Sequence, residues 1–174
     1  FGVPVGILTA VFMAYYCPKK IYKPLKAATE LLAGIPSVVY GFFGLVVIVP
    51  LIRTIGRDLG FGGNGSSILT ASILLGMMIL PTVIGLTESS IRAVPEQYYE
   101  GAVALGATHE RAIFRVVIPA AKSGVVAAIV LGVGRAIGET MAVIMVAGNQ
   151  ARMPAGIFRG VRTLTANIVI EMGY

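Results

Sequence analysis

Charged residues are scarce in this chain. Only 13% of the 174 residues are charged and 56% are hydrophobic, whereas soluble domains carry about a quarter charged residues. This composition excludes an ordinary soluble domain and predicts a membrane protein. The formal net charge is +6, but the basic residues stand at the ends of apolar runs, as membrane anchors do, rather than among exposed aromatic residues. Nucleic acid is therefore not a predicted partner.

Cysteine and histidine each occur once, and the familiar catalytic and nucleotide-binding motifs are absent. Cys17 alone excludes an internal disulfide, and His109 has no second His or Cys at ligand spacing, so we predict no metal and no cofactor. The apolar runs hold no Ser–His or paired-Asp arrangement. The chain lacks the phosphate-binding GxxxxGK[ST] loop, and GVGRAIG at 132–138 has neither the preceding strand nor the spacing of a dinucleotide fingerprint. We predict a protein that is not an enzyme and that takes any energy from another chain.

The apolar runs predict an all-α integral membrane protein. Four of them approach or exceed the roughly 20 residues that cross a bilayer as a helix, and a fifth begins near the end of the chain. Pro36 is predicted to bend the second run, or to mark where an interfacial helix turns into the membrane. Glycine-rich loops are expected at 53–67 and 148–156. The predicted spans are residues 1–16, 25–52, 67–86, 117–147 and the start of a last one near 165–174.

Both ends of the sequence suggest a piece of a longer protein. The chain begins with Phe1 rather than Met, already inside an apolar run. As a helix, residues 1–16 would extend only about 24 Å, and the last apolar run is unfinished. We therefore expect a fragment with about four membrane helices and part of a fifth.

A polar loop at 88–115 interrupts the apolar runs and contains a spaced motif. The motif begins with a glutamate and two small residues. A glycine follows after three further residues, and the motif ends with two apolar residues and a proline. Residues 100–119 read EGAVALGATHERAIFRVVIP, with the spaced positions at Glu100, Gly101, Ala102, Gly106, Val116, Ile118 and Pro119.

The same loop is predicted to form two short helices that meet at Gly106. Glycine adopts the left-handed turn that ends a helix at little cost, and Thr108 is suited to cap a second helix over 109–114. The first helix carries a narrow apolar stripe of Tyr98, Ala102 and Leu105. We interpret the loop as a docking element for a partner protein. The alternative is an ordinary surface hairpin between two spans.

Two charged residues lie inside the fourth apolar run. Arg135 and Glu139 are four residues apart, so on one continuous helix they would point the same way. Each charge costs about 3 kcal/mol in a membrane, so the two are expected to pair and to face the protein interior or a watery path. Arg135 is then either a station for a passing anion, tuned by Glu139, or half of a salt bridge that fixes helix packing. Nearby glycines would let another helix or a solute approach: Gly132, Gly134 and Gly138.

The distribution of basic residues predicts the orientation. Cytoplasmic loops carry the excess of Lys and Arg, which places the loop at 88–115 in the cytoplasm. The predicted inner residues are Lys19, Lys20, Lys23, Lys26, Arg92, Arg111, Arg115 and Lys122; the outer ones are Arg53, Arg57, Arg152, Arg159 and Arg162. Arginine suits oxyanions, so the outer group either helps receive an anion or its carrier protein, or only contacts lipid phosphates.

The motif at 100–119 resembles the EAA loop of binding-protein-dependent ABC-importer permeases, E-A-A-x3-G-x9-I-x-L-P. Gly101 replaces the first Ala of that pattern, and Val116 and Ile118 replace its Ile and Leu. With GIPSVVYGFFGL at 34–45 and GRAIGETMAVIMVAGN at 134–149, essentially the whole chain resembles the PstC family of phosphate permeases. The resemblance implies a type I ABC importer transmembrane domain of the MetI-like fold.

The resemblance also implies a function and partners. The family forms the membrane pathway for inorganic phosphate in the bacterial inner membrane, beside a second permease subunit (PstA-like). A PstB-like ATPase dimer supplies the energy, and a periplasmic PstS-like protein delivers phosphate. Coupling to the ATPase then falls to Glu100, Gly101, Ala102, Gly106 and Pro119, and the pathway to Arg135 and Glu139. Open alternatives are a PstA-like subunit, a permease for sulfate or molybdate, an intramembrane enzyme and a structural scaffold.

Overall fold

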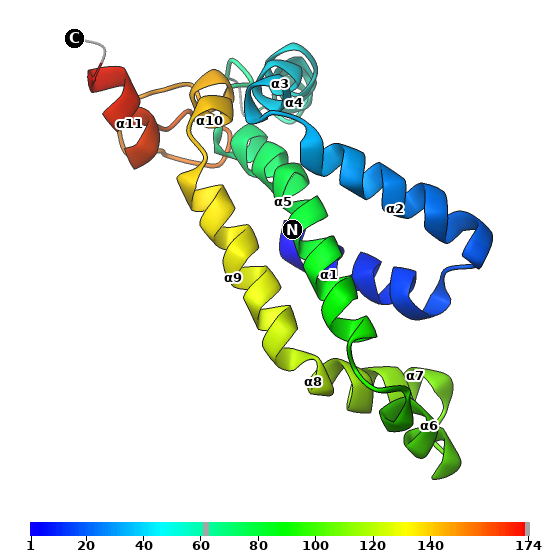
Figure 1. Ribbon diagram of the computed structural model, residues 1–174. Coiled ribbons are helices and arrows are strands. Elements are labelled where there is room, and N and C mark those ends of the chain that lie inside the picture. The colour runs from blue at the N-terminus through cyan, green and yellow to red at the C-terminus, as the bar shows by residue number, and fades with distance from the viewer. Residues whose placement is uncertain (61–62, 173–174) are drawn as a thin grey trace. The chain divides into compact units, whose positions relative to one another are not determined.

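The computed structural model describes residues 1–60 and 63–172, and every regular element in that range is a helix (Figure 1). The prediction of an all-α protein is confirmed. The chain divides into two compact units: Phe1–Ala33 with Ile79–Gly134, and Gly34–Met78 with Arg135–Tyr174. Two long helices, α5 (Ile68–Arg92) and α9 (Lys122–Gly138), contribute residues to both units.

The first unit is built around α1 and the second half of α5. Gly6 of α1 packs so closely on α5 that an added Cβ would lie 2.8 Å from Val83 Cγ1, so glycine is required at this contact. A buried apolar cluster then joins α1 and α5 to the helices that follow them: Val11, Ile91, Ile113, Val117 and Ala121. Besides α5 and α9, the elements of this unit are α1 (Gly2–Val11), η1 (Phe12–Tyr16), α2 (Lys19–Gly34), α6 (Glu96–Ala104), α7 (His109–Ala112), η3 (Ile113–Val117) and α8 (Ile118–Ala120).

The second unit packs α3 against α10. An added Cβ at Gly41 would lie 2.9 Å from Ala142 Cα, so only a glycine permits this approach. The buried core around the contact includes Ile48, Leu74 and Val146. Besides α5 and α9, the elements of this unit are α3 (Ser37–Phe43), η2 (Gly44–Ile48), α4 (Val49–Asp58), α10 (Met141–Val146) and α11 (Leu164–Glu171).

By length and composition, two helices of the described chain can cross a membrane: Ser37–Asp58 and Ile68–Arg92. The pair His109–Ala120 and Lys122–Gly138, which is bent by 70°, would make a third. Gly2–Tyr16 is a shorter apolar helix. Pro81 lies inside α5 without ending it. Large apolar side chains such as Phe42 and Ile137 are exposed, at 60% and 70%, as expected of a surface that faces lipid or a partner helix.

The second predicted span, 25–52, is corrected by the structure. Pro36 is extended, with φ −61° and ψ 144°, and its ring disfavours a helical conformation at the residue before it, Ile35. The apolar helix therefore starts at Ser37, and α2 is a separate helix with no buried residue. The helix also continues past residue 52 into the predicted loop and ends at Asp58, just before Gly60 with φ +74°.

The fourth predicted span, 117–147, is not one straight helix. It bends at Ala121 between α8 and α9, and it breaks again at residues 139–140 between α9 and α10. At the break, α9 ends on Gly138, and glycine is a poor helix former. Thr140 stands just before α10, and threonine is common at this position of a helix. The predicted loop at 148–156 contains no helix. Residues 61–62 of the 53–67 loop and residues 173–174 of the last predicted span lie outside the described residues.

Candidate functional site

The predicted loop at 88–115 starts later in the structure, because α5 continues to Arg92. Beyond α5 it folds into two short helices, α6 and α7, joined by a tight turn at Gly106. Gly106 has φ +87°, in the left-handed region. Its N–H donates to Val103 O at 2.9 Å, and Ala107 N–H donates to Ala102 O at 3.0 Å, which together form a Schellman motif. Thr108 then caps α7, because its hydroxyl accepts from Arg111 N–H. The turn and the cap are where the sequence predicts them.

The tip of this element is exposed. Leu105 is 92% exposed and Tyr98 53%, and α6 has no buried residue. Glu100 and Gly101 of the EAA-like motif are exposed as well, and a Cβ at Gly101 would meet nothing within 4 Å. An apolar stripe next to a small residue on a free helix face has the form of a docking surface.

An aromatic cluster holds the other side of the element against η1. The Tyr99 hydroxyl and His109 Nδ1 lie 2.8 Å apart, which links α6 to α7. The His109 ring packs edge-on against Tyr15 and Tyr16 of η1, with ring centroids 6.3 and 5.1 Å away. His109 thus has a structural contact that the sequence did not indicate, because its aromatic partners are far away in the chain.

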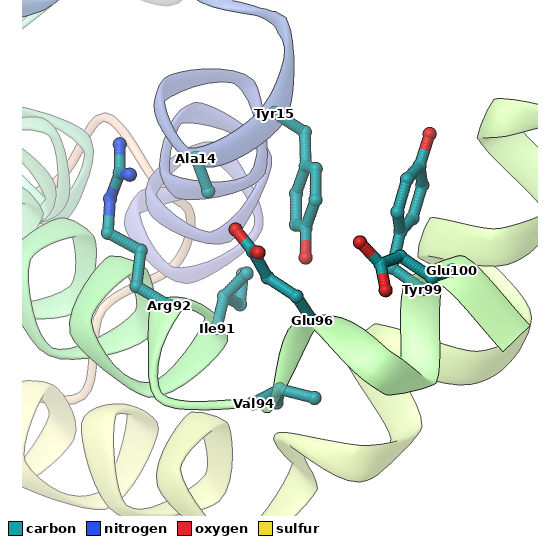
Figure 2. Close-up of a pocket in the computed structure, with 8 residues that line it drawn as sticks. All are labelled: Ala14, Tyr15, Ile91, Arg92, Val94, Glu96, Tyr99 and Glu100. Carbon is teal, nitrogen blue, oxygen red and sulfur yellow. The ribbon is translucent and has the colours of Figure 1, made fainter.

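A pocket of about 360 Å³ opens beside this cluster (Figure 2). Residues of η1, the end of α5 and α6 line it, and two of them, Glu96 and Glu100, bring carboxylates to it. Figure 2 shows both carboxylates beside the Tyr15 ring. The first glutamate of the EAA-like motif therefore lines a partly acidic pocket at the base of the exposed tip.

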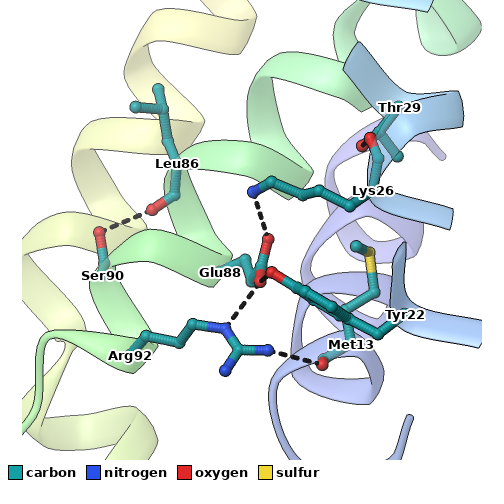
Figure 3. Close-up of polar contacts among 8 residues, drawn as sticks. All are labelled: Met13, Tyr22, Lys26, Thr29, Leu86, Glu88, Ser90 and Arg92. Carbon is teal, nitrogen blue, oxygen red and sulfur yellow. Dashed lines mark hydrogen bonds and ion pairs between the residues drawn. The ribbon is translucent and has the colours of Figure 1, made fainter. Parts of the chain in front are cut away.

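A buried carboxylate ties three elements together just before the loop (Figure 3). Glu88 of α5 is 1% exposed and accepts three hydrogen bonds: from Tyr22 Oη at 2.6 Å, Lys26 Nζ at 2.7 Å and Arg92 Nε at 2.7 Å. Arg92 also donates to Met13 O of η1 at 3.1 Å and lies over the Tyr22 ring, 4.7 Å from its centroid. The Glu88 network therefore joins η1, α2 and the end of α5.

The three donors account for the burial of this charge. A buried carboxylate is costly unless it is paired and hydrogen-bonded, and Glu88 has two cations and a phenol. The hydrogen bond to Glu88 raises the pKa of the Tyr22 phenol and also that of the Lys26 ammonium group, so both stay protonated donors at neutral pH. Glu88 was not predicted as a buried residue, because residue 88 was expected to lie in the polar loop. The Glu88–Arg92 spacing of four was the available signal.

We expect a Glu88→Gln substitution to destabilise the protein strongly. Removing one partner from a buried ion pair costs about 3–5 kcal/mol, and an amide replaces only part of the three-donor arrangement. The thermal unfolding midpoint of the purified assembly measures the loss. The matched control is Glu110→Gln, which removes the same charge from an exposed position on α7. Equal midpoints for the two variants would contradict a structural role for the Glu88 network.

Arg135 and Glu139 lie at the break between α9 and α10, rather than on one helix as predicted. Glu139 follows the last residue of α9, and its Oε1 accepts from Ala142 N–H of α10 at 3.1 Å. Arg135, in the last turn of α9, interacts electrostatically with Tyr40 of α3. Both charged residues are half-buried. The i, i+4 spacing on one helix, from which an Arg135–Glu139 pair was predicted, therefore does not apply. The Glu139 carboxylate instead accepts a hydrogen bond from the first turn of α10.

The glycines near this site differ in their surroundings. A Cβ at Gly132 would lie 2.7 Å from Val83 Cγ2, so this glycine allows α9 to pack on α5. At Gly134 and at Gly138 nothing lies within 4 Å, which leaves space for an approaching helix or solute. Pro119 lies in the first turn of α8, two residues before the bend at Ala121.

Among residues 1–60 and 63–172, no group of three or more His, Cys, Asp or Glu side chains is placed to hold a metal ion.

The fold and the exposed two-helix loop define the membrane domain of a transport protein. Residues 2–172 match the sequence profile described as "Binding-protein-dependent transport system inner membrane component". The chain belongs to this family of membrane permeases, and its helical architecture is the MetI-like transmembrane fold.

Individual relatives agree with this assignment. "Probable ABC transporter permease protein YqgH" of Bacillus subtilis is 43% identical, over 99% of this chain and 55% of that protein. "Phosphate transport system permease protein PstC" of Mesorhizobium japonicum is 37% identical, over 98% and 57%. "PstC 2" of Mycobacterium tuberculosis is 39% identical, over 87% and 51%. The chain thus spans about half the length of the curated relatives it matches.

A solved structure supports the fold. It is described as "Crystal structure of an amino acid ABC transporter with histidines" and superimposes with a TM-score of 0.52 at 22% identity. The match covers 99% of this chain and 71% of that chain. At this identity the likeness concerns the fold alone.

Proposed function

We propose that this chain is the permease subunit of an ATP-driven importer and forms the membrane pathway for inorganic phosphate. The observation that carries the proposal is the exposed α6–α7 element, which has EAA-loop spacing in a chain of the permease family. Relatives named as phosphate transport permeases support phosphate as the solute. The protein then lies in the bacterial inner membrane as a multi-pass subunit, beside a PstA-like permease and with a PstS-like carrier outside.

In this proposal the α6–α7 element docks into a PstB-like ATPase. The exposed Leu105 and Tyr98 supply apolar contacts, Gly101 and Ala102 allow close backbone approach, and Glu100 receives a basic or amide group of the partner. Movement of the docked loop is transmitted through its aromatic contacts to η1 and through the Glu88 network to α2 and α5. Because of these contacts, the loop moves together with the helices to which it is joined, and not independently of them.

The pathway site of the proposal is Arg135 at the end of α9. Its positive charge offsets part of the dehydration of a passing anion, and the nearby Glu139 carboxylate limits how tightly that anion is held. Such a compensated site binds and releases, whereas a tight one would trap the solute. The open sides of Gly134 and Gly138 leave room for the partner subunit or the solute.

The proposed orientation predicts which loops face outward. After Cys17→Ser, a Glu110→Cys variant places its thiol on α7 and a Met153→Cys variant places it in the 147–163 loop, where Met153 is 93% exposed. An impermeant maleimide added to intact cells should label the Met153→Cys protein only. Permeabilised cells should show labelling of both. Labelling of the Glu110→Cys protein from outside would reverse the topology.

Competition in transport tests the solute. Vesicles that contain the complete assembly should take up labelled phosphate, and excess unlabelled phosphate should suppress the uptake. Sulfate and molybdate at the same excess should leave it nearly unchanged. Uptake that sulfate or molybdate suppresses more strongly than phosphate would assign the permease to that other oxyanion.

A further inference from the structure

A second site rich in hydrogen-bond donors lies in the second unit, and Arg135 is not among the residues that line it. It is a pocket of about 280 Å³ formed by residues 63–66, 148–152 and 158–160. Five of its lining side chains carry hydrogen-bond donors and none is a carboxylate: Asn64, Ser66, Gln150, Arg152 and Arg159. We call it the two-arginine pocket. A volume of this size leaves room for a tetrahedral oxyanion together with part of its hydration.

The walls of the pocket are fixed by backbone hydrogen bonds. Ile68 N–H donates to Arg159 O at 3.1 Å, Leu69 N–H to Ile157 O at 3.0 Å, and Val161 N–H to Ala147 O at 2.9 Å. These bonds connect the three segments that line the pocket. The arrangement is therefore part of the fold and does not depend on a bound ligand.

Glycines make this close approach possible. A Cβ at Gly148 would lie 3.1 Å from Ser66 O, and the φ of +84° at Gly148 already disfavours any other residue. A Cβ at Gly160 would lie 3.1 Å from Ala147 O, and one at Gly63 would lie 3.3 Å from Phe158 O. Each glycine thus brings one lining segment against the backbone of another.

The two guanidinium groups of the pocket lack a neutralising partner in the described chain. Within residues 1–60 and 63–172, neither Arg152 nor Arg159 has a carboxylate within 4 Å or a side-chain hydrogen bond. Arg162, ten residues after Arg152, is different: its Nη1 lies 3.3 Å from Glu171 Oε1 and 3.1 Å from Asn167 Oδ1. The neighbouring arginine is therefore engaged in structure, whereas the pair in the pocket is available.

We propose that the two-arginine pocket is an oxyanion-binding site, additional to the Arg135 station. Guanidinium groups donate to phosphate-like anions in paired, charge-assisted hydrogen bonds, and the amide and hydroxyl donors of the lining complete the shell. The tetrahedral anion is free phosphate or the phosphate of a lipid headgroup, which share this chemistry. That the pocket lies on the outer side of the membrane, and that the anion is phosphate, rests on the proposed function. Free phosphate held there would be concentrated at the entrance of the pathway.

A binding titration tests this site directly. The purified permease assembly, in a sugar detergent at low salt and without its binding protein, is titrated with inorganic phosphate by calorimetry. Combined Arg152→Gln and Arg159→Gln substitutions should weaken binding about tenfold or more, because charge-assisted bonds are lost. The matched control, Arg57→Gln, removes an exposed charge on α4 and should change the affinity less than about twofold. Both pocket arginines are exposed, so their replacement leaves the core intact.

Two further arms separate the possible outcomes of this titration. An Arg135→Gln assembly should still bind phosphate in the two-arginine pocket even if it no longer transports phosphate. Failure of the pathway proposal can therefore be distinguished from failure of this one. In nanodiscs, an anionic lipid can occupy the pocket in place of free phosphate. If phosphate then no longer binds, and if anionic lipid is retained only when Arg152 and Arg159 are present, the site is supported with a lipid headgroup as its occupant. Unchanged phosphate affinity in the double variant, with no such lipid retention, would overturn the proposal.

Discussion

An Arg135→Gln assembly is expected to insert and hydrolyse ATP yet to transport phosphate at least about tenfold more slowly than wild type. A charge-assisted hydrogen bond contributes about 1.5–3 kcal/mol, and each 1.4 kcal/mol changes a rate tenfold. Glutamine keeps a polar side chain at this half-buried position, so the helix end should remain folded. Initial uptake rates in vesicles, normalised to the amount of inserted protein, measure the effect.

The double variant with Arg135→Gln and Glu139→Gln separates transport from packing. The carboxylate of Glu139 accepts from Ala142 N–H, and a glutamine oxygen can accept the same bond, so the start of α10 is preserved. If the two charges served only helix packing, their joint removal should be tolerated and transport should recover. If Arg135 is the anion station, transport stays low, because no positive charge remains to offset dehydration. Near wild-type transport would make the site structural.

A Gly106→Val substitution is expected to uncouple ATP hydrolysis from transport. Gly106 has φ +87°, and a β-branched residue in that region costs about 1–3 kcal/mol. A Cβ there would meet nothing within 4 Å, so the cost is one of backbone conformation and not of a clash. The turn between α6 and α7 should distort while the membrane helices still insert. Co-purification of the ATPase and phosphate uptake should both fall.

Two matched variants of the same α6–α7 element serve as controls. Gly106→Asn should retain most transport, because asparagine tolerates the left-handed conformation. Gly101→Ala introduces the residue that the EAA pattern has at this position and fits the open space there. It should leave coupling intact. Wild-type uptake by a stably expressed Gly106→Val protein would contradict the docking role of the loop.

The loop was predictable because its determinants are local. The turn at Gly106 depends on one residue that accepts a positive φ, and the cap at Thr108 depends on one hydroxyl three residues before Arg111 N–H. Both rules operate within a few residues of sequence. The start of the first long span at Ser37 depends likewise on Pro36, although the sequence allowed two readings of that proline.

The Glu88 network and the aromatic cluster were not predictable in this way. Glu88 meets Tyr22 and Lys26, which lie 66 and 62 positions earlier in the chain. His109 meets Tyr15 and Tyr16 of η1, which lie still further back in the chain, 94 and 93 positions earlier. Contacts at such distances depend on how helices pack, which no local pattern encodes. The break at residues 139–140 was not predicted because no proline lies near it in the apolar run, and Gly138 was interpreted as a packing residue.

Reconstitution of transport from purified subunits tests the central claim most directly. Proteoliposomes that contain this permease in its full-length form, its partner subunit and the ATPase are given the binding protein and labelled phosphate on the outside, with ATP inside. We expect phosphate accumulation that requires ATP hydrolysis, stops with a non-hydrolysable analogue, and falls at least about tenfold with Arg135→Gln. Accumulation at the same rate when this subunit is omitted, or with Arg135 replaced, would contradict the claim that the chain forms the phosphate pathway.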